Sequence, residues 1–423
     1  MKPITFLFFL FSVLCSHAQT EFDKFFTSNT MRVDFVFAGN ATNEQIYLHQ
    51  IKKEPYWGGP KINLIDNLDY GEYKFELWDV QSGSLIYSKG FCTLFEEWQT
   101  TDEAKLVDKS FFQTIIFPYP QQQVLLKLYS RLWEGDFKKI FETTINPGSY
   151  FVQPEIKDYA FEKILDNGDP SAKVDLVFLA EGYTAGEMDK FKSDSRRMMD
   201  YVFSQLPFNQ QKNNFNVWIV MCPSEESGTD IPGQNVYRKT ILNSNFYTFD
   251  SERYLTTTDV LSVRDAAAVV PYDDICILVN SDKYGGGGIY NHYAISTIDH
   301  YLSEKVFIHE FGHSFAGLGD EYYTSSTSYN DFFNLNIEPW QPNLTTLVNF
   351  ELKWKEKVGS DTPIPTPREK KYESTIGVFE GGGYVSKGMY SPFQDCRMKS
   401  NEAEGFCPVC QDAIIKMILF KTN

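Results

Sequence analysis

The amino-acid sequence predicts a multidomain α+β protein, in which an N-terminal β-sandwich is followed by an α/β domain. The chain has 423 residues, and since domains usually contain about 100–200 residues, two or three domains are expected. Residues 31–155 contain short runs of alternating apolar and polar residues between turn residues, a pattern typical of half-buried strands. Residues 174–298 instead combine longer apolar runs with an amphipathic stretch, which is typical of a layered α/β domain.

Composition and charge exclude two classes of protein. The chain carries 39 Lys and Arg against 56 Asp and Glu, which gives a net charge of −17 at pH 7. Proteins that bind nucleic acids need a basic surface to neutralise phosphates, so a nucleic-acid partner is not expected. A hydrophobic fraction of 42% is enough to build cores, so the chain is not an acidic disordered segment.

Residues 1–18 have the features of a secretory signal peptide. A lysine precedes the apolar run Ile4–Leu14, and small residues flank the expected cleavage site after Ala18. The run is too short to span a membrane, and no other segment approaches the ~20 apolar residues that a span requires. We therefore expect an exported protein that is secreted, periplasmic or at the cell surface. A lipid anchor on Cys15 is not expected, because the leucine before it is bulkier than a lipidation motif normally accepts.

The first domain, expected over residues 19–158, is predicted to be a β-sandwich. Its apolar residues alternate with a period of two, and no segment shows the 3.6-residue period of an amphipathic helix. Gly39, Asn67 and Gly83 mark turns between the runs. The expected strands are Met31–Phe37, Gln45–His49, Tyr73–Trp78, Leu85–Tyr87, Phe112–Phe117, Val124–Tyr129 and Lys139–Ile145.

The second domain, expected over residues 159–423, begins with a strand followed by a helix. Val174–Leu179 is an apolar run with the length of a buried strand. Thr184 and Glu187 have the spacing of a capping box, and an amphipathic stretch follows them. A strand–helix–strand beginning indicates a layered α/β domain. Further strands are expected at Phe215–Met221, Asp274–Val279 and Tyr293–Ile298.

The motif His309-Glu310-Phe311-Gly312-His313 lies in an apolar segment of helical length, Val306–Ala316. Two histidines at positions i and i+4 share one helix face, about 6 Å apart, so both imidazoles can bind one Zn²⁺. Zinc lowers the pKa of bound water to about 7, and Glu310 can accept the proton of that water as it attacks a carbonyl. The spacing therefore predicts a hydrolytic zinc site. A helix with two structural histidines is the alternative, because the motif fixes only three positions.

The residues after this helix are suited to supply a third zinc ligand. Gly317 permits a left-handed turn at the end of the helix, and the reversed chain can bring Asp320 back over the metal. Two histidines and one carboxylate leave the fourth position of a tetrahedral zinc ion free for water. Asp320 is the expected third ligand, and Glu321 remains open as the alternative. A glutamate on a more distant helix is a further alternative, although no Asn-Glu-x-x-Asp pattern follows downstream.

Four stretches together resemble a known family. The segment His309–Tyr322 is similar to the signature of the IgA-peptidase family, metallopeptidase family sixty-four. Phe178–Thr184, Glu226–Asp230 and Cys396–Met398 add to the resemblance, which covers roughly residues 160–420 and leaves a family-associated N-terminal domain before it. The resemblance implies a secreted zinc endopeptidase whose catalytic domain has a metzincin-like architecture.

Carried over residue by residue, the resemblance implies that His309, His313 and Asp320 bind zinc and that Glu310 is the general base. It also implies that Met398 belongs to a turn beneath the metal, although core packing is the ordinary role of a methionine. The sequence departs from the general metzincin pattern at one point. The glycine lies eight residues after His309 rather than seven, and the acidic residue eleven rather than ten. Because of this extra residue, Glu321 remains open as the third ligand.

The cysteines near the C-terminus resemble a second type of metal site. Cys396-x-Met398 followed by Cys407-Pro408-Val409-Cys410 is similar to the archaemetzincins, which hold a second zinc with four cysteines. Here Glu321 occupies the place of the fourth cysteine. A disulfide from Cys396 to Cys407 or Cys410 is therefore expected in an exported protein, and a second, structural ion is not expected.

Two features near the zinc motif bear on substrate binding. Gly285–Gly288 and Asn291–Ser296 lie where metzincins carry the strand that pairs with substrate backbone, although a flexible hairpin loop is the ordinary interpretation of such glycines. A tyrosine could stabilise the oxyanion of the reaction. The candidates are Tyr322, Tyr323, Tyr384 and Tyr390.

The sequence therefore predicts a secreted zinc metalloendopeptidase with one catalytic ion and a protein or peptide substrate, such as immunoglobulin A or another extracellular host protein. A surface binding protein or adhesin on a catalytically retired protease fold is the alternative, and a zinc amidase acting on cell-wall peptides is a third. The complete set of His309, Glu310 and His313 favours an enzyme, because a retired site has no need of both ligands and base.

Overall fold

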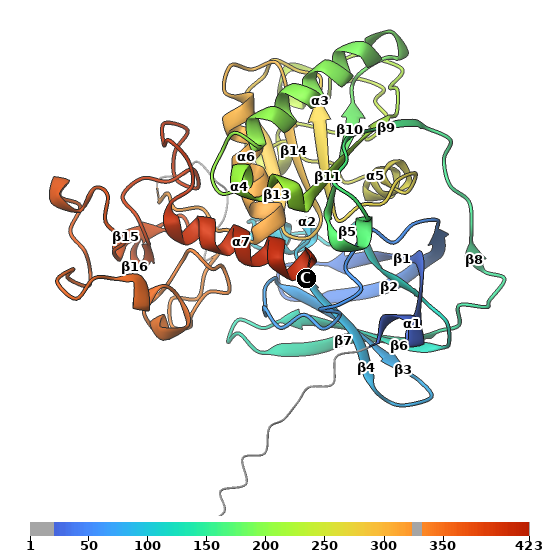
Figure 1. The fold of residues 1–423 in the computed structure, drawn as a ribbon, viewed down its shortest axis with the longest axis horizontal. Coiled ribbons are helices and arrows are strands. Elements are labelled where there is room, and N and C mark those ends of the chain that lie inside the picture. The colour runs from blue at the N-terminus through green and yellow to red at the C-terminus, as the bar shows by residue number, and fades with distance from the viewer. Residues whose placement is uncertain (1–20, 324–331, 423) are drawn as a thin grey trace, which may run out of the picture.

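The computed structural model describes residues 21–323 and 332–422, so the predictions for residues 1–18 and Cys15 lie outside the described residues. Within these ranges the chain forms two sheets of four strands, one of six and one of two (Figure 1). The N-terminal part and the second part each have their own hydrophobic core. The expected multidomain α+β class is therefore confirmed.

The N-terminal part contains the two four-stranded sheets. Their strand orders are β5-β1-β2-β8 and β4-β3-β6-β7. One core takes side chains from both sheets, including Phe35 of β1, Phe75 of β3 and Leu126 of β6. All seven runs predicted from alternation lie within β1 to β7. The strands are β1 (Phe26–Gly39), β2 (Glu44–Glu54), β3 (Tyr73–Asp79), β4 (Leu85–Phe91), β5 (Lys109–Pro120), β6 (Val124–Arg131), β7 (Phe137–Ile145) and β8 (Val152–Gln153).

Two short helices of this part, α1 (Phe22–Phe25) and α2 (Leu94–Gln99), were not predicted. The hydroxyl of Thr93 accepts a hydrogen bond from the backbone N–H of Glu96, and the Glu96 carboxylate accepts one from the backbone N–H of Thr93. This capping box starts α2. Because α2 has fewer than two turns, no 3.6-residue period develops that could reveal it in the sequence.

The second part is built on a six-stranded sheet with the order β13-β14-β12-β10-β11-β9. The four central strands are parallel, and β9 and β13 pair antiparallel at the two edges. The predicted strands coincide with β10, β11, β12 and β14. The strands are β9 (Ala160–Leu165), β10 (Val174–Glu181), β11 (Phe215–Met221), β12 (Asp274–Val279), β13 (Gly286–Ile289) and β14 (Tyr293–Thr297).

Helices pack on this sheet and position the motif His309–His313. The expected capping contact forms, since the Glu187 carboxylate accepts a hydrogen bond of 2.8 Å from the Thr184 N–H at the start of α3. Helix α6 packs against β13 and β14 and contacts α3 and α7, while α5 contacts both β10 and β5 and so lies between the two parts. The helices are α3 (Met188–Val202), α4 (Phe208–Gln211), α5 (Val260–Ala267), α6 (Ser303–Ala316) and α7 (Pro408–Thr422).

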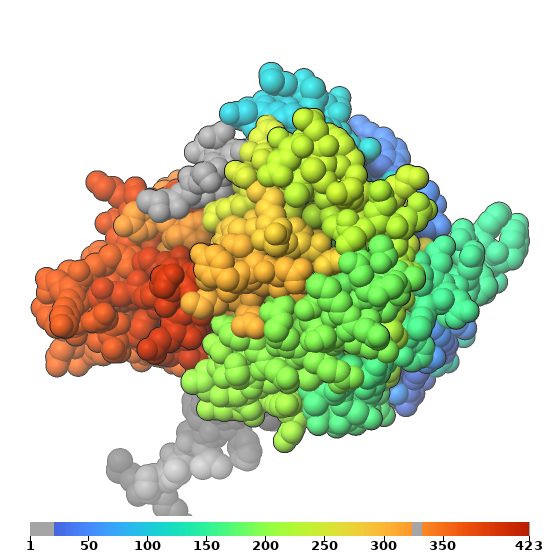
Figure 2. All heavy atoms as spheres, turned by 90° about the horizontal axis from the view of Figure 1, so that it is seen from above, coloured from blue at the N-terminus to red at the C-terminus, as the bar shows by residue number. Residues whose placement is uncertain are grey.

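The C-terminal segment follows α6 and forms one side of the molecule. It contains the two-stranded sheet of β15 (Phe379–Gly382) and β16 (Val385–Ser391) and ends in α7. In the space-filling view its orange and red surface lies beside the yellow and green surface of the second part (Figure 2). Among the described residues, no helix is long and apolar enough to cross a membrane.

Candidate metal centre

Helix α6 carries the two histidines and ends as the sequence predicts. Gly317 has a φ of 64° in the left-handed region. Its N–H donates to the carbonyl of His313 at 3.0 Å, and the Leu318 N–H donates to the carbonyl of Gly312 at 3.3 Å. These bonds close the helix and reverse the chain. The reversed chain returns directly over the face that holds the histidines.

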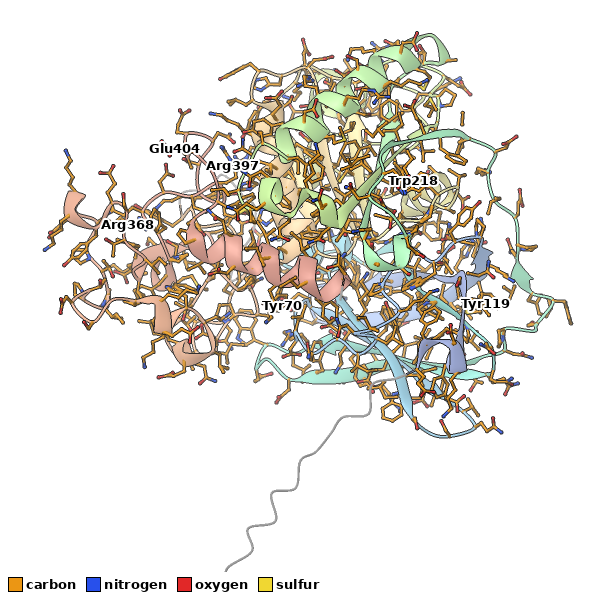
Figure 3. All side chains as sticks on the ribbon, viewed as in Figure 1. Tyr70, Tyr119, Trp218, Arg368, Arg397 and Glu404 are labelled. Carbon is orange, nitrogen blue, oxygen red and sulfur yellow. The ribbon has the colours of Figure 1, made fainter. Side chains whose placement is uncertain are left out.

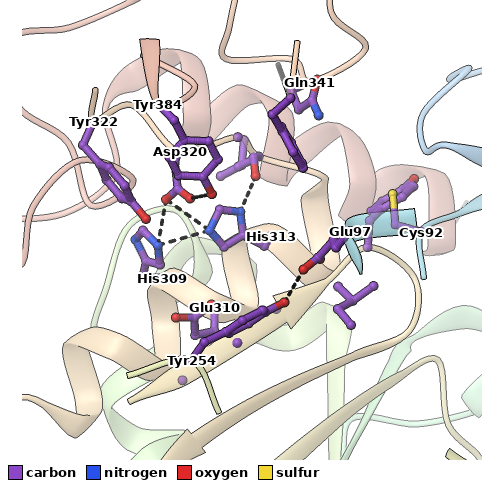
Figure 4. A pocket seen from close by; sticks show the side chains of 18 of the residues that line it. Cys92, Glu97, Tyr254, His309, Glu310, His313, Asp320, Tyr322, Gln341 and Tyr384 are labelled. Atoms are coloured by element: carbon purple, nitrogen blue, oxygen red, sulfur yellow. Dashed lines mark hydrogen bonds and ion pairs between the residues drawn. The ribbon is translucent and has the colours of Figure 1, made fainter. Parts of the chain in front are cut away.

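Three potential ligand atoms converge at this point (Figure 4). The Nε2 atoms of His309 and His313 are 3.1 Å apart. Asp320 Oδ1 lies 3.1 Å from His309 Nε2 and 3.3 Å from His313 Nε2. The structure therefore brings together the three residues that the sequence analysis selected as metal ligands.

Backbone carbonyls orient both imidazoles. His309 Nδ1 lies 2.9 Å from the carbonyl oxygen of Arg397, and His313 Nδ1 lies 2.5 Å from that of Leu318. A carbonyl oxygen can only accept, so each Nδ1 carries its proton and each Nε2 keeps a lone pair toward the other ligands. In this tautomer Asp320 Oδ1, which is buried, has no hydrogen-bond donor within the described part of the chain.

The carboxylates at the site have shifted pKa values. Burial raises the pKa of Glu310 above its ordinary value, although His309 and His313 oppose part of this effect. Burial acts on Asp320 in the same direction, but the imidazoles of His313 and His309, when protonated, outweigh it and hold the Asp320 pKa well below its ordinary value. Asp320 is therefore the more acidic of the two carboxylates, and Glu310 has the higher proton affinity.

The glycine run packs as a strand directly against α6, so its interpretation as a flexible loop is wrong. A Cβ atom on Gly288 would lie 2.2 Å from the backbone oxygen of Glu310. A Cβ atom on Gly286 would lie 3.0 Å from Glu310 Oε1. Only glycine permits this approach of β13 to α6, because any side chain would collide with the helix.

A cavity of about 370 Å³ opens beside the three ligand atoms and Glu310. Both parts of the chain line it, since Glu72 and Cys92 come from the N-terminal part together with Glu96 and Glu97 of α2. The Tyr254 hydroxyl donates to Glu97 and so joins the two parts across the cavity wall (Figure 4). No local pattern in the sequence indicates that the N-terminal part reaches this site.

Two of the four candidate tyrosines line the cavity. The Tyr384 hydroxyl donates to Asp320 Oδ2, and Tyr322 also lines the cavity. Tyr323 is instead 39% exposed, and neither it nor Tyr390 is among the described residues that line the cavity. Arg253, which the sequence analysis missed, also lines it, and its charge acts on Tyr322 and Asp320.

The turn that contains Met398 lies against α6. Met398 is fully buried, and its Sδ is 2.9 Å from the position that a Cβ on Gly312 would take. The Arg397 guanidinium, labelled in Figure 3, donates to the carbonyls of Asn401 at 3.0 Å and Ala403 at 2.7 Å. These bonds fix the turn that supplies the carbonyl partner of His309.

Glu321 points away from the cavity toward the C-terminal cysteines. Its Oε1 accepts a hydrogen bond of 3.1 Å from the thiol of Cys410. The expected disulfide is wrong for this structure, because Cys396, Cys407 and Cys410 are all free thiols. The Sγ atoms of Cys396 and Cys410 are 3.7 Å apart, whereas a disulfide requires about 2.05 Å.

Two stretches of the family resemblance serve the fold rather than the cavity. The Glu181 carboxylate, at the end of β10, is fully buried and accepts from the backbone N–H groups of Leu242 and Ser244. Gly182 approaches Gly228 so closely that a Cβ on it would lie 1.9 Å from the Gly228 oxygen. These contacts hold the loop after β11 against the sheet.

Comparisons with known proteins cover most of the chain. The family model described as IgA Peptidase M64 matches residues 163–373 and 368–418. The model described as Peptidase M64 N-terminus matches residues 21–142. No curated protein matches the chain. The matches span both the N-terminal part and the part that carries the converging histidines and aspartate.

Proposed function

The chain belongs to the IgA peptidase M64 family, and we propose that it is an exported zinc metalloendopeptidase that cleaves proteins outside the cell. Membership assigns a peptidase of a metallopeptidase family, and therefore a hydrolase with a protein or peptide substrate. One observation carries the proposed mechanism. It is the convergence of His309 Nε2, His313 Nε2 and Asp320 Oδ1 within 3.3 Å of one another, beside Glu310 in the cavity.

The residues fit a zinc ion. Zinc binds imidazole nitrogen and carboxylate oxygen at about 2.0–2.2 Å, so two ligand atoms of a tetrahedral site lie about 3.3–3.5 Å apart. The three distances of 3.1–3.3 Å are close to this value. A cation would also satisfy Asp320 Oδ1, which has no hydrogen-bond donor among the described residues. Glu321 is the weaker candidate for third ligand, because its carboxylate contacts Cys410 instead.

Glu310 is the proposed general base. A bound zinc ion would supply Lewis acidity toward water and the substrate carbonyl. Glu310 would accept a proton from the attacking water and return it to the leaving amine. Tyr322, Tyr384 and Arg253 line the cavity and are the proposed donors to an oxyanion.

The architecture supports the finer fold predictions. We assign residues 19–158 to a β-sandwich, because two four-stranded sheets, antiparallel apart from the β2–β8 pair, enclose one core. We assign residues 159–423 to a metzincin-like catalytic domain. The order of α6, glycine turn, Asp320 and the buried Met398 supports the latter. Tyr254 already forms a bridge to Gly286 at the outer edge of β13. Substrate backbone would therefore pair with the part of this edge that lies beyond Gly286.

The rival functions remain distinct in chemistry. The proposed substrate class is immunoglobulin A or another extracellular host protein. The proposal of export rests on the signal peptide expected over residues 1–18. A binding protein or adhesin on a retired protease fold is disfavoured because both histidines and Glu310 are intact and face one cavity. A cell-wall amidase would use the same metal chemistry on a different substrate.

The experiment that tests this proposal compares wild-type protein with Glu310→Ala on casein and on immunoglobulin. We expect the wild type to cleave at least one of them and a chelator to stop the cleavage, while Glu310→Ala is inactive but still binds metal. Cleavage that is unchanged by Glu310→Ala and insensitive to the chelator contradicts the mechanism. N-terminal sequencing of the fragments would define the specificity.

A further inference from the structure

A second group of metal-ligating side chains lies behind the candidate active site. Glu321, Cys396, Cys407 and Cys410 place one ligand atom each within 4.8 Å of one another. Glu321 lies in the chain after α6, whereas the cysteines lie more than 70 residues later, in the turn before Met398 and at the start of α7. Glu321, Cys396 and Cys410 are 0% exposed and Cys407 is 4% exposed.

We propose that these four residues bind a structural zinc ion, contrary to the expectation from the sequence. Thiolates bind zinc at about 2.3 Å, so two of them in a tetrahedral site lie about 3.8 Å apart. The Sγ atoms of Cys396 and Cys410 are 3.7 Å apart. Three thiolates and one carboxylate complete the four-coordinate shell of a closed site, and thiolate ligands favour zinc over magnesium or calcium.

The buried carboxylate of Glu321 points independently to a cation. Oε1 accepts from the Asn343 amide at 3.0 Å, whereas Oε2 is buried and has no hydrogen-bond donor among the described residues. A buried carboxylate oxygen without a partner is costly, and a metal ion would remove that cost. Asn343 also donates to the Gly319 carbonyl at 2.8 Å, so the ligand is held from outside the cluster.

Positively charged groups lie close to the four side chains. Cys407 and Cys410 flank the first turn of α7, whose positive end stabilises negative charge. The backbone N–H of Cys407 donates to the Sγ of Cys396 at 3.2 Å. Lys399 and Arg368 lie close enough for their charges to interact with Glu321. These cations offset the excess negative charge of three thiolates and a carboxylate around one divalent ion.

A disulfide accounts for the cluster less well. It would join two of the three cysteines and leave the third thiol and the Glu321 carboxylate buried together. The metal instead uses all four side chains, which is why we prefer it to the disulfide expected from export.

The ion would stabilise two segments that support the candidate active site. Glu321 follows Asp320 directly, and its N–H donates to the Met398 carbonyl at 2.8 Å. Cys396 precedes Arg397, whose carbonyl is the partner of His309 Nδ1. A cation bound to both Glu321 and Cys396 would therefore fix the third ligand and the turn beneath it.

Zinc content of purified protein tests this inference. The full chain is expressed in zinc-supplemented medium and purified without chelator, and we expect about two equivalents of zinc. The double variant His309→Ala/His313→Ala should keep about one equivalent, and after cobalt substitution it should show thiolate-to-cobalt charge-transfer absorption. Cys407→Ser/Cys410→Ser should lose this absorption, whereas Cys276→Ser, which removes a buried thiol elsewhere, should not.

A second measurement covers variants that fail to fold. The histidine double variant, which keeps all its cysteines, is titrated with a mercurial reagent, and released zinc is measured with a chromogenic chelator. We expect about one equivalent of zinc to be released as the thiols react. A histidine double variant without zinc overturns the proposal, as does a mass two units lower than that of the fully reduced chain, which indicates a disulfide. Because the histidine variant lacks the candidate catalytic site, failure of one site is distinguishable from failure of the other.

Discussion

The two groups of candidate metal ligands meet at the adjacent residues Asp320 and Glu321 but differ in access to solvent. His309 and His313 have side chains that are 15% and 17% exposed, and they border a cavity of about 370 Å³. The cysteine group, Glu321 with Cys396, Cys407 and Cys410, is enclosed in the core. Catalytic zinc sites keep one position open, whereas structural sites are closed. The difference therefore supports the proposed catalytic role of the first group and the proposed structural role of the second.

Two consecutive carboxylates, Asp320 and Glu321, contact different groups of side chains. Asp320 contacts both imidazoles, and Glu321 contacts Cys410. Both carboxylates lie in residues 317–323, a segment that is neither helix nor strand. Because the two side chains face opposite sides of the chain, one short segment supplies a ligand to each group.

Substitution of Asp320 should produce the largest effect. Asp320→Asn removes the charged ligand, so we expect a loss of metal affinity at the open site greater than the 10–100-fold effect typical of an outer partner. Casein cleavage should fall at least as far, while the zinc bound by the cysteine group is retained. Glu304→Gln, on the surface of the same helix, makes the same charge change and should leave both quantities as in the wild type. Equal zinc loss from both groups in Asp320→Asn would mean that they are not separate sites.

Tyr384→Phe should have an intermediate effect. It removes the hydroxyl that donates to Asp320 Oδ2, and loss of such an outer partner usually costs about 10–100-fold in metal affinity or activity. Equilibrium zinc competition measures the affinity, and initial cleavage rates at saturating zinc separate a binding defect from a catalytic one. Tyr390→Phe is the matched control, because Tyr390 lies outside the cavity. An unchanged zinc affinity in Tyr384→Phe would show that this hydrogen bond does not support the open site.

Gly288→Ala should have the smallest effect of the three. It should disturb the packing of β13 on α6, the helix that carries His309 and His313. The added Cβ would lie 2.2 Å from the backbone oxygen of Glu310, so β13 and α6 must separate. Overpacking of this kind typically costs about 1–3 kcal/mol in the free energy of unfolding, which denaturant titration measures. Gly186→Ala is the control, because the nearest atom to its Cβ would be 4.0 Å away. Equal stabilities of the two variants would contradict the tight packing of β13 on α6.

The local features of the site were predictable from the sequence because they depend on near neighbours. The spacing of His309 and His313, the glycine that ends the helix and the following aspartate all lie within twelve residues, so helix geometry alone brings them together. The alternating runs of the N-terminal part likewise identify β1 to β7, because their period of two records which side faces the core.

The remaining features depend on packing between distant segments. The carboxylates of α2 reach the cavity only because the two parts of the chain meet there, and Arg253 and Tyr254 reach it because their segment packs beside β13. The disulfide prediction was wrong because the sequence places Glu321 where a fourth cysteine would be but does not show that its carboxylate folds into contact with Cys410. The glycines of β13 were ambiguous because their purpose is contact with α6, which no short stretch of sequence records.

The most direct test follows zinc and activity together in the wild-type protein. A chelator is added until casein cleavage stops, the retained zinc is measured, and zinc is then titrated back. We predict that cleavage stops on release of about one equivalent, that the enclosed ion stays bound, and that about one equivalent of zinc restores the rate. Full cleavage by protein from which all zinc has been removed would contradict the account.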